Sequence, residues 1–264
     1  MRLEKWYLDA VFPDGTVWFG YQARLRLRRC PPISWACGCE VLPDGRERKT
    51  ARWRLWDEPR LEGGQWHWTA PDGFQARWTP RGPGMESPLG SDRQFRARWT
   101  CLAPNAVVTR TRDGAKARGG GPDPGDRGVG YVEHLQLDAA AVGPPFRRLW
   151  WGRAHAEESS LVWIRWDGGR DLTLIWENGA PVAGDFESLA GGGARIRTAR
   201  GQWETGRGRT LCDRDARRSF PRWLVRLAGG MAPTRECKMA GPALWRAGAE
   251  ESVGTGVWEE VEWA

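Results

Sequence analysis

Short runs of alternating apolar and polar residues fill most of the chain, and turn signals separate them at intervals of 8–14 residues. The clearest turn signals are the tripeptides Pro13-Asp14-Gly15, Pro43-Asp44-Gly45 and Pro71-Asp72-Gly73. Proline presets the φ of a turn, aspartate bonds the nearby backbone and glycine accepts a positive φ, so each tripeptide marks the end of a strand. No window of 12 residues carries the period of 3.6 that is typical of an amphipathic α-helix. The sequence therefore predicts an all-β protein of meandering antiparallel strands with little helix.

The first two predicted strands form a hairpin. In residues 6–12, Tyr7 and Asp9 share one face, and the other face is apolar. Residues 17–28 also alternate with a period of two, with Tyr21 on one face and Gln22 on the other, followed on that second face by three arginines. We expect this hairpin to have one solvent-exposed face.

A segment rich in Gly, Pro and Asp interrupts the strands between residues 111 and 128, and it has almost no large apolar residue. This composition is typical of a loop or linker. We therefore predict a barrel-like half in residues 1–110, a linker or loop in residues 111–127, and a second barrel-like half in residues 128–264. The two halves have similar numbers of predicted strands without an obvious sequence repeat. A single large β-sandwich is the alternative.

Charge and hydropathy disfavour several kinds of partner. The formal net charge is +7, but only four of the 40 basic residues are lysines and the arginines are scattered along predicted strands. This distribution does not favour nucleic-acid binding. No apolar run approaches 18 residues, so no transmembrane segment is predicted. The first residues lack an apolar stretch followed by a small-residue cleavage site, and we therefore expect a cytoplasmic protein.

The sequence offers no recognisable set of metal or cofactor ligands. The six cysteines form no Cys-x-x-Cys pair, and Cys37 and Cys39 with the distant Cys30 lack the second half of a zinc set, so reduced thiols are expected. The motifs GxSxG, GxGxxG and HExxH and the phosphate-binding loop are also absent. We expect neither a metal nor a cofactor.

Tryptophan is the unusual component of the sequence, with 19 copies against seven phenylalanines and three tyrosines. A buried tryptophan needs a partner for its N–H group. Such rings line cavity walls and barrel interiors as readily as they build solid cores.

Residues 128–166 concentrate reactive side chains, because they hold two of the three histidines and four of the 19 tryptophans. On a strand, Tyr131 and Glu133 share one face and His134 points to the other. A carboxyl beside an aromatic ring and away from water has a raised pKa and can act as a general acid near neutral pH. The alternative is that Leu135 and Leu137 face the core while Glu133 lies in solvent at the end of the strand.

Two further runs in this stretch have a defined face pattern. Residues 161–166 are apolar on both faces, which predicts a central strand that is covered on each side. Trp151, Arg153 and His155 share one face of the preceding strand. That arrangement fits contact with an anion or a polar head group, and it fits an outer strand face equally well.

The motifs Gly130-Tyr131-x-Glu133-His134, Trp151-Gly152-Arg153-Ala154 and Ser160-Leu161-Val162-Trp163 together resemble the carotenoid 1,2-hydratase family. That family includes hydroxyneurosporene synthase and AttH-like proteins, and tocopherol cyclases look like its relatives. Tyr7-Leu8-Asp9-Ala10 is similar to its first hairpin, and residues 254–259 are similar to its last strand. The resemblance implies two lipocalin-like (calycin-like) antiparallel β-barrel halves with a hydrophobic cavity in or between them. It also implies chemistry on greasy polyenes, by addition of water to carotenoid double bonds or by cyclisations that include Diels–Alder type reactions.

By the same resemblance Tyr131, Glu133, His134 and Trp151 line or support the pocket. Together with the strand faces, this predicts two catalytic residues, Glu133 and Tyr131, and five substrate-binding residues, His134, Trp151, Arg153, His155 and Trp163.

The predicted function is that of a cofactor-independent hydratase or cyclase acting on a hydrophobic polyene or isoprenoid-like molecule. In it Glu133 would protonate an alkene or fix a water, and tryptophan faces would stabilise the developing cation. The alternatives are a non-catalytic lipid or pigment carrier with the same pocket, and a surface-interaction β-sandwich without a pocket.

Overall fold

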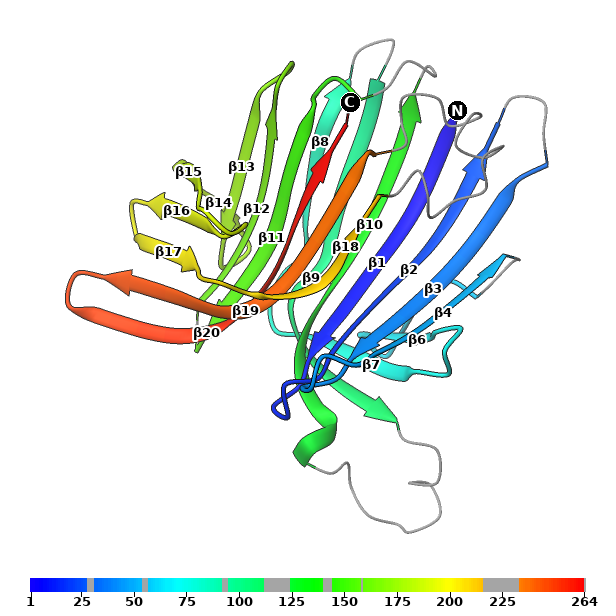
Figure 1. Cartoon of the computed structure of the whole chain (residues 1–264), viewed down its shortest axis with the longest axis horizontal. Coiled ribbons are helices and arrows are strands. Elements are labelled where there is room, and N and C mark those ends of the chain that lie inside the picture. Colours follow the sequence, from blue (N-terminus) through cyan, green and yellow to red (C-terminus); the bar gives the residue numbers. More distant parts are fainter. Residues whose placement is uncertain are drawn as a thin grey trace. The chain divides into compact units, whose positions relative to one another are not determined.

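The computed structural model describes residues 1–27, 31–53, 57–91, 95–111, 124–139, 144–157, 159–215 and 233–263. The chain divides into two compact units, Met1–Asp138 and Ala139–Ala264, and each unit is described by itself. Each unit is built on one strongly curled antiparallel sheet of ten strands (Figure 1). Among the described residues the helical structure consists of the short 3₁₀ turn η2 (Pro124–Asp126), so the all-β prediction is confirmed.

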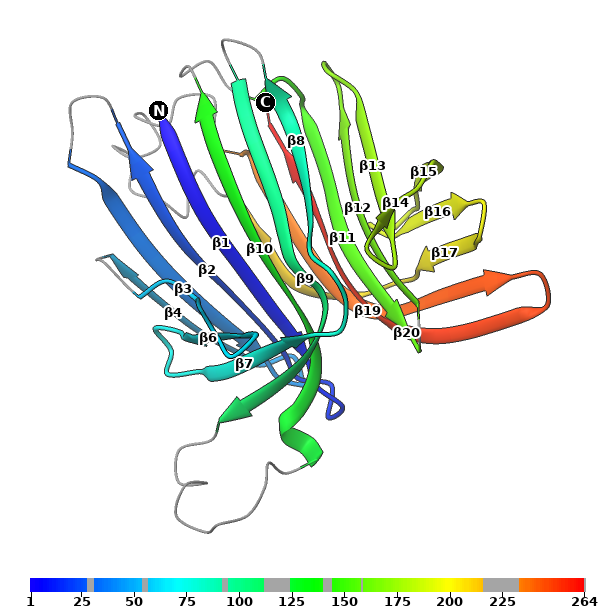
Figure 2. The ribbon, with the colours of Figure 1, turned by 180° about the vertical axis from the view of Figure 1, so that it is seen from behind.

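The first sheet has the strand order β4-β3-β2-β1-β10-β9-β7-β6-β5, and β8 pairs with β9. Strand β1 therefore lies between β2 and β10, as both views of the ribbon show (Figures 1 and 2). The strands of this sheet are β1 (Arg2–Val11), β2 (Val17–Arg26), β3 (Ile33–Val41), β4 (Glu47–Trp53), β5 (Arg60–Glu62), β6 (Gln65–Thr69), β7 (Gln75–Pro80), β8 (Met85–Ser91), β9 (Phe95–Thr111) and β10 (Arg127–Ala139).

The second sheet has the order β14-β13-β12-β11-β20-β19-β17-β16-β15, and β18 pairs with β19. Its strands are β11 (Arg148–Ala156), β12 (Ser159–Asp167), β13 (Leu172–Glu177), β14 (Ala180–Pro181), β15 (Gly184–Ser188), β16 (Ala194–Thr198), β17 (Gly201–Thr205), β18 (Arg209–Arg214), β19 (Arg235–Ala247) and β20 (Glu250–Glu262).

The two sheets repeat one topology. Raising every strand number of the first order by ten reproduces the second order, including the strand that lies off the main path. Thus β11 and β20 occupy in the second sheet the central place that β1 and β10 occupy in the first. The repeat is therefore one of strand order and is not obvious in the sequence.

Strand pairing assigns β10 to the first unit, whereas the second half is predicted to begin at residue 128. The whole of β1 pairs with β10, from Arg2 opposite Asp138 to Val11 opposite Val129. A period of two shows which face a side chain takes and says nothing about which strand lies beside it. Most of the predicted linker, residues 112–123, lies outside the described residues.

Residues 196–203 form the hairpin of β16 and β17, and residues 185–190 contain most of β15. Strand β12 is buried on both faces between β11 and β13, as its apolar pattern predicted.

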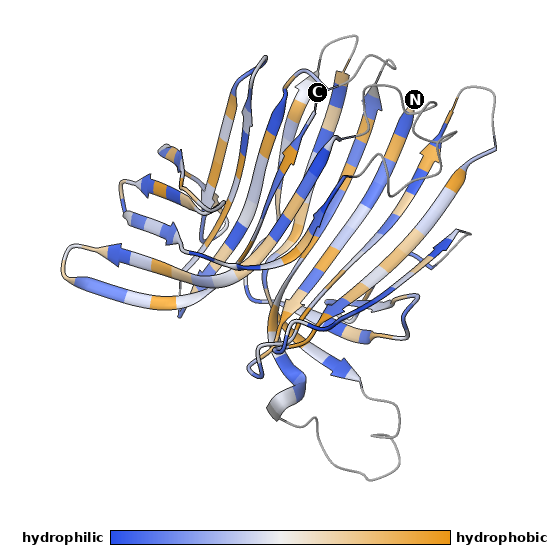
Figure 3. Cartoon of the chain, in the orientation of Figure 1, coloured by the Kyte–Doolittle hydropathy of each residue, from blue (hydrophilic) through white to orange (hydrophobic). Residues whose placement is uncertain are grey.

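An aromatic core covers one face of the first sheet. Trp18 stacks on Phe74 with ring centroids 4.1 Å apart, and its indole also contacts Trp68 and Trp78. The indole N–H groups are bonded: that of Trp18 donates to Oδ2 of Asp72 at 3.0 Å, and that of Trp78 donates to the carbonyl oxygen of Asp9 at 2.8 Å. These tryptophans therefore pack as a core with satisfied polar groups. Apolar and polar residues alternate along the long strands (Figure 3).

The prediction that the first hairpin has one solvent-exposed face is wrong for most of β2. Gln22 is only 2% exposed, because it lies on the face that carries Trp18 and the aromatic core. The opposite face, which carries Tyr21, is buried as well. Exposure begins only at Arg24 and Arg26, near the end of the strand.

The second sheet has a core of its own, to which Trp163 and Trp203 contribute. Gly152 faces Trp163 across the β11–β12 pair, and a Cβ at residue 152 would lie 2.7 Å from Cε2 of that indole and closer still to Cζ2. A glycine is therefore needed there to seat the ring. The indole of Trp203 donates to the buried carboxyl of Glu177 at 3.1 Å.

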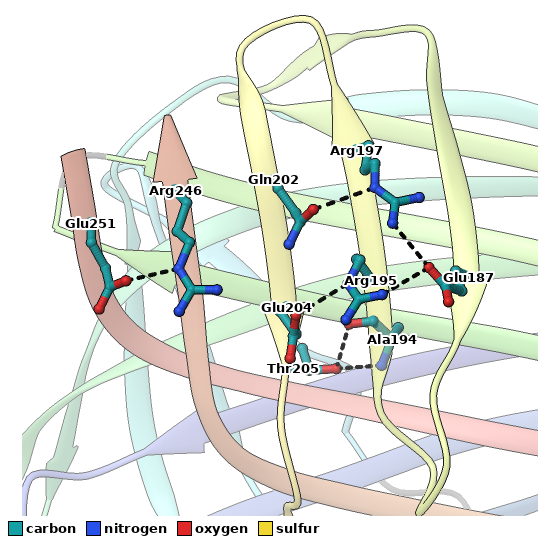
Figure 4. Close-up of polar contacts among 9 residues, drawn as sticks. All are labelled: Glu187, Ala194, Arg195, Arg197, Gln202, Glu204, Thr205, Arg246 and Glu251. Atoms are coloured by element: carbon teal, nitrogen blue, oxygen red, sulfur yellow. Dashed lines mark hydrogen bonds and ion pairs between the residues drawn. The ribbon is translucent and has the colours of Figure 1, made fainter. Parts of the chain in front are cut away.

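Exposed arginines of the second sheet pair with carboxylates on neighbouring strands. Arg195 of β16 contacts Glu187 of β15 at 3.0 Å and Glu204 of β17 at 3.2 Å (Figure 4). In the same close-up Arg197 contacts Glu187, and Arg246 contacts Glu251. These arginines form ion pairs across neighbouring strands. In this part of the second sheet, such pairs explain why arginines are scattered along the strands.

Candidate functional site

The three tyrosines of the chain lie on one face of three adjacent strands of the first sheet. Tyr7 of β1 is directly opposite Tyr21 of β2, with ring centroids 5.2 Å apart. On its other side the ring of Tyr7 lies 6.1 Å from the ring of Tyr131, on β10. This face is opposite to the one that carries Leu8, Ala10 and the aromatic core, because side chains alternate along β1.

Glu133 accepts two hydrogen bonds on this face. The hydroxyl of Tyr131 donates to Oε2 of Glu133 at 2.8 Å, because residues two apart on a strand point the same way. The indole Nε1 of Trp99, on the neighbouring strand β9, donates to the same oxygen at 2.6 Å. Two donors on one oxygen fix the orientation of the carboxyl and stabilise its ionised form. The alternative position for Glu133, in solvent at a strand end, is wrong because Glu133 lies in the middle of β10 and is half-buried.

Asp9 forms a second pair of the same kind with Tyr7. The hydroxyl of Tyr7 donates to Oδ2 of Asp9 at 2.9 Å, and the Asp9 residue is 0% exposed. In the β1–β10 register Tyr7 is opposite Glu133 and Asp9 is opposite Tyr131. We call Tyr7, Asp9, Tyr131 and Glu133 the tyrosine–carboxyl cluster.

The hydroxyl of Tyr131 stays protonated. Burial raises the pKa of Tyr131 well above its usual value, and the nearby Cys101 thiol and Glu133 carboxyl raise the pKa further. The phenol is therefore a neutral donor throughout the physiological range of pH. Its role in this arrangement is to hold Glu133 and to present a hydroxyl at the site.

His134 lies on the opposite face from Glu133, as strand alternation predicted. Its ring stacks on Trp6 with centroids 4.3 Å apart, and its Nε2 lies 3.8 Å from Oε1 of Glu4. Burial lowers the pKa of His134, although the carboxylates of Glu4 and Glu58 oppose that shift. The imidazole is therefore neutral at pH 7 and packs against the aromatic side of the sheet, away from the tyrosine–carboxyl cluster.

The other predicted site residues belong to the second unit. Trp151, Arg153 and His155 of β11 share a face, and all three are buried, with Arg153 0% exposed, so the solvent-exposed outer face that was the alternative is wrong. Lys238 of β19 lies over the ring of Trp151, 5.3 Å from its centroid, and forms an ion pair with Glu259 of β20. Trp163 lies on the opposite face, in the core of that unit. The predicted residues are thus distributed over two separate sheets.

Three members of the arrangement around Glu133 were not predicted: Tyr7, Asp9 and Trp99. A signal for the first two is present, because Tyr7-Leu8-Asp9 repeats the pattern of Tyr131-Val132-Glu133. No sequence signal identifies Trp99, because its contact depends on β9 lying beside β10.

Two further properties concern only the part of the chain that the structure describes. There, no three His, Cys, Asp or Glu side chains are grouped in a way that could hold a metal ion. Within the same residues, no helix has the length and apolarity needed to cross a bilayer.

No protein-family model matches the chain, and no curated protein matches it by sequence. Its fold is similar to that of solved structures over nearly its whole length. Kievitone hydratase from Nectria haematococca matches with a TM-score of 0.61 at 9% identity, covering 98% of this chain and 88% of that one. CghA, solved with Sch210972, matches with a TM-score of 0.57 at 13% identity, covering 99% and 88%. A protein proposed to be AttH, from Nitrosomonas europaea, matches with a TM-score of 0.56 at 15% identity, covering 98% and 92%. The chain therefore has the AttH-like fold that these three proteins share.

Proposed function

We propose that the chain is a cofactor-independent hydratase or cyclase that acts on a hydrophobic polyene or isoprenoid-like small molecule at the tyrosine–carboxyl cluster. The observation that carries this proposal is the carboxyl of Glu133, oriented by the Tyr131 hydroxyl and the Trp99 indole within a buried aromatic face. A carboxylate in such a place can hold a water and take a proton from it as the water adds to a double bond.

The surrounding rings suit the cationic character of such a reaction. Protonation of a polyene leaves a positive charge on carbon, and the faces of Tyr7, Tyr131 and Trp99 carry negative quadrupole potential. These rings are held by packing and by hydrogen bonds before substrate arrives, so they need little reorganisation. The geometry thus supports proton transfer to an apolar substrate.

The fold comparison supports the same class of reaction. One protein that shares the fold is named as a hydratase, of kievitone, and another was solved with the compound Sch210972. Kievitone and Sch210972 are both small molecules, and the name kievitone hydratase describes the addition of water. Action on carotenoid double bonds is the narrower form of the proposal and rests on the sequence motifs around Tyr131 and Trp151.

A non-catalytic carrier is the second candidate, and the buried aromatic face with its hydroxyl donors would also suit a bound pigment or lipid. The two functions differ in the fate of the ligand. Purified protein is incubated with kievitone and, separately, with a carotenoid-containing lipid extract, and the recovered compounds are analysed by mass spectrometry. Gain of one water, or an isomer of unchanged mass, supports catalysis, and recovery of intact bound compound alone supports the carrier.

The Glu133→Gln variant tests the role of the carboxyl. Gln keeps the size of the side chain and removes its ability to exchange a proton, so we expect turnover to be abolished while the fold is kept. Glu62→Gln, an exposed change on β5 of the same sheet, is the matched control and should leave turnover unchanged. Normal turnover by Glu133→Gln would eliminate the proposed role.

A further inference from the structure

The sequence pattern tyrosine-x-carboxylate occurs twice on the central strand pair of the first sheet, once on β1 and once on β10. We infer that Asp9 and Glu133 form a single two-carboxyl acid–base centre, each carboxyl held by its own tyrosine, and that Asp9 is the second proton-transfer group of the reaction. This inference rests on the proposed function of the same site and adds to it a residue, a division of roles and a direction of water access.

The register of the two strands arranges the four side chains as a square. Tyr7 is opposite Glu133 and Asp9 is opposite Tyr131, so the two tyrosines lie on one diagonal and the two carboxyls lie on the other. The tyrosine diagonal is seen directly in the distance of 6.1 Å between ring centroids. Diagonal neighbours across an antiparallel pair are about 7–8 Å apart. The register therefore makes Asp9 and Glu133 diagonal neighbours on one face of the sheet.

Both tyrosines act on the carboxyl of their own strand. Tyr7 donates to Asp9 at 2.9 Å and Tyr131 donates to Glu133 at 2.8 Å, and each donor lies two residues before its acceptor. Because the strands are antiparallel, the two pairs run head to tail. Each hydroxyl therefore orients one carboxyl, so Tyr7 and Tyr131 are positioning residues for the two proton-transfer groups.

The four residues of the square differ in their exposure to solvent. We use this difference to distinguish the proton donor, Asp9, from the proton acceptor, Glu133. Asp9 and Tyr131 are fully buried, whereas Glu133 is half-buried and is followed on β10 by residues that are also only half-buried. Water therefore reaches the centre at Glu133. The two donors on Oε2 of Glu133 stabilise a carboxylate there, which suits a group that takes a proton from water.

Other titratable groups lie near the tyrosine–carboxyl cluster and contribute to the electrostatic potential there. Lys5 of β1 lies over the ring of Tyr21 of β2, 4.4 Å from its centroid. Cys101 of β9 interacts with Tyr131, and Cys37 of β3 is opposite Tyr21. Among these neighbours Lys5 is the cation, and Asp9 and Glu133 are the carboxyls.

The proposed step balances with water as its only co-reactant. Asp9 gives its proton to one carbon of the double bond, and the π electrons of that bond form the new C–H bond. Water adds to the neighbouring carbon through oxygen while Glu133 accepts one of its protons. The proton then returns from Glu133 to Asp9 through water, and the product is the substrate plus one molecule of water. In a cyclisation the second proton is removed from carbon in place of water.

The first test needs no substrate. Protein labelled with ¹³C at the carboxyl carbons of Asp and Glu is examined by NMR at one fixed pH. The Glu133 signal is assigned with Glu133→Gln, and the Asp9 signal with Asp9→Asn or, where that variant does not fold, with Asp9→Glu. We expect Glu133→Gln to shift the Asp9 signal, because the two carboxyls are diagonal neighbours on one face of the sheet. An Asp9 signal that Glu133→Gln leaves unchanged would overturn the inference.

The second test uses turnover of kievitone, or of the compound converted in the experiment above. Asp9→Asn should reduce turnover by at least about 10²-fold, as we expect of Glu133→Gln, while binding of the fluorescent polyene cis-parinaric acid is kept. Loss of activity in Glu133→Gln with full activity in Asp9→Asn would overturn this inference and leave the proposed function standing. Full activity in both variants would overturn the proposed function itself.

Discussion

The indole of Trp99 donates to Oε2 of Glu133 at 2.6 Å, across the boundary between β9 and β10. This bond joins two residues that are 34 positions apart in the sequence. Together with the Tyr131 hydroxyl it fixes the carboxyl that we propose to transfer protons. Trp99 is therefore the residue through which β9 contributes to the site.

Replacing Trp99 by phenylalanine tests that contribution. Trp99→Phe keeps an aromatic ring and removes the N–H donor, so the free energy of unfolding should fall by about 1.5–3 kcal/mol, the range for a hydrogen bond to a charged group. Turnover should fall as well, because Glu133 loses an orienting donor. Urea unfolding measures the first effect. Trp53→Phe is the control, because Trp53 is 42% exposed and its change should stay within about 0.5 kcal/mol. Equal losses in the two variants would contradict a specific role for the Trp99 donor.

The buried pair of Lys238 and Glu259 should be sensitive to the loss of one partner. Lys238 is 1% exposed, so Lys238→Met leaves the Glu259 carboxyl without its counter-charge in a dry environment. We expect a loss of about 3–5 kcal/mol in the free energy of unfolding, most of which the double variant Lys238→Met/Glu259→Leu should recover. Arg246→Met, which breaks the exposed pair with Glu251, should cost about 1 kcal/mol or less. A double variant as unstable as Lys238→Met alone would show that charge burial is not the cause.

Gly152 is expected to tolerate no side chain. A Cβ there would overlap the indole of Trp163, so Gly152→Ala should lower the free energy of unfolding by about 1–3 kcal/mol through overpacking. Gly206→Ala is the matched control in the same unit, because nothing lies within 4 Å of the added carbon. Thermal and urea unfolding of both variants check the difference. Wild-type stability of Gly152→Ala would mean that the Trp163 ring can move aside.

His134 should make the first unit less stable in acid. Its pKa is lowered in the folded state by burial, so below its usual value of 6.5 the unfolded chain binds a proton that the folded chain resists. Stability from this residue is complete above that pH and is lost as the pH falls from 6.5 towards the lower folded value. His134→Phe keeps a ring against Trp6 and removes the titration, so it should flatten the loss of stability on acidification. Urea unfolding at neutral and mildly acidic pH measures the slope, and identical slopes in both proteins would refute this assignment.

Much of the fold follows from the alternation of side chains, and the faces within a strand were predictable. Tyr131 and Glu133 share a face, His134 takes the other, and β12 is covered on both sides, all because successive residues of a strand point in opposite directions. The meandering antiparallel strands also follow from the spacing of turns, whereas a single large β-sandwich remained an alternative to two sheets. These properties are local, so the sequence contains them directly.

Strand partnership was not predictable in the same way. The pairing of β10 with β1 brings Asp9 beside Tyr131, and the pairing of β9 with β10 brings Trp99 to Glu133. Neither neighbour is visible in a pattern of period two, which is the same for every order of strands. The repeated Tyr-x-acid pattern suggests a relation only after the register is known.

Each sheet pairs its first strand with its last, β1 with β10 and β11 with β20, so a unit cannot complete its centre until almost all of it has been synthesised. On the ribosome, β1 and β2 can form a hairpin early, but β1 keeps an open edge until β10 emerges. Closing so long a loop is slow, and the waiting edge could be occupied by a wrong strand. Strands β11 to β20 are synthesised after β10, so the order of synthesis favours the correct partner over the strands of the second sheet.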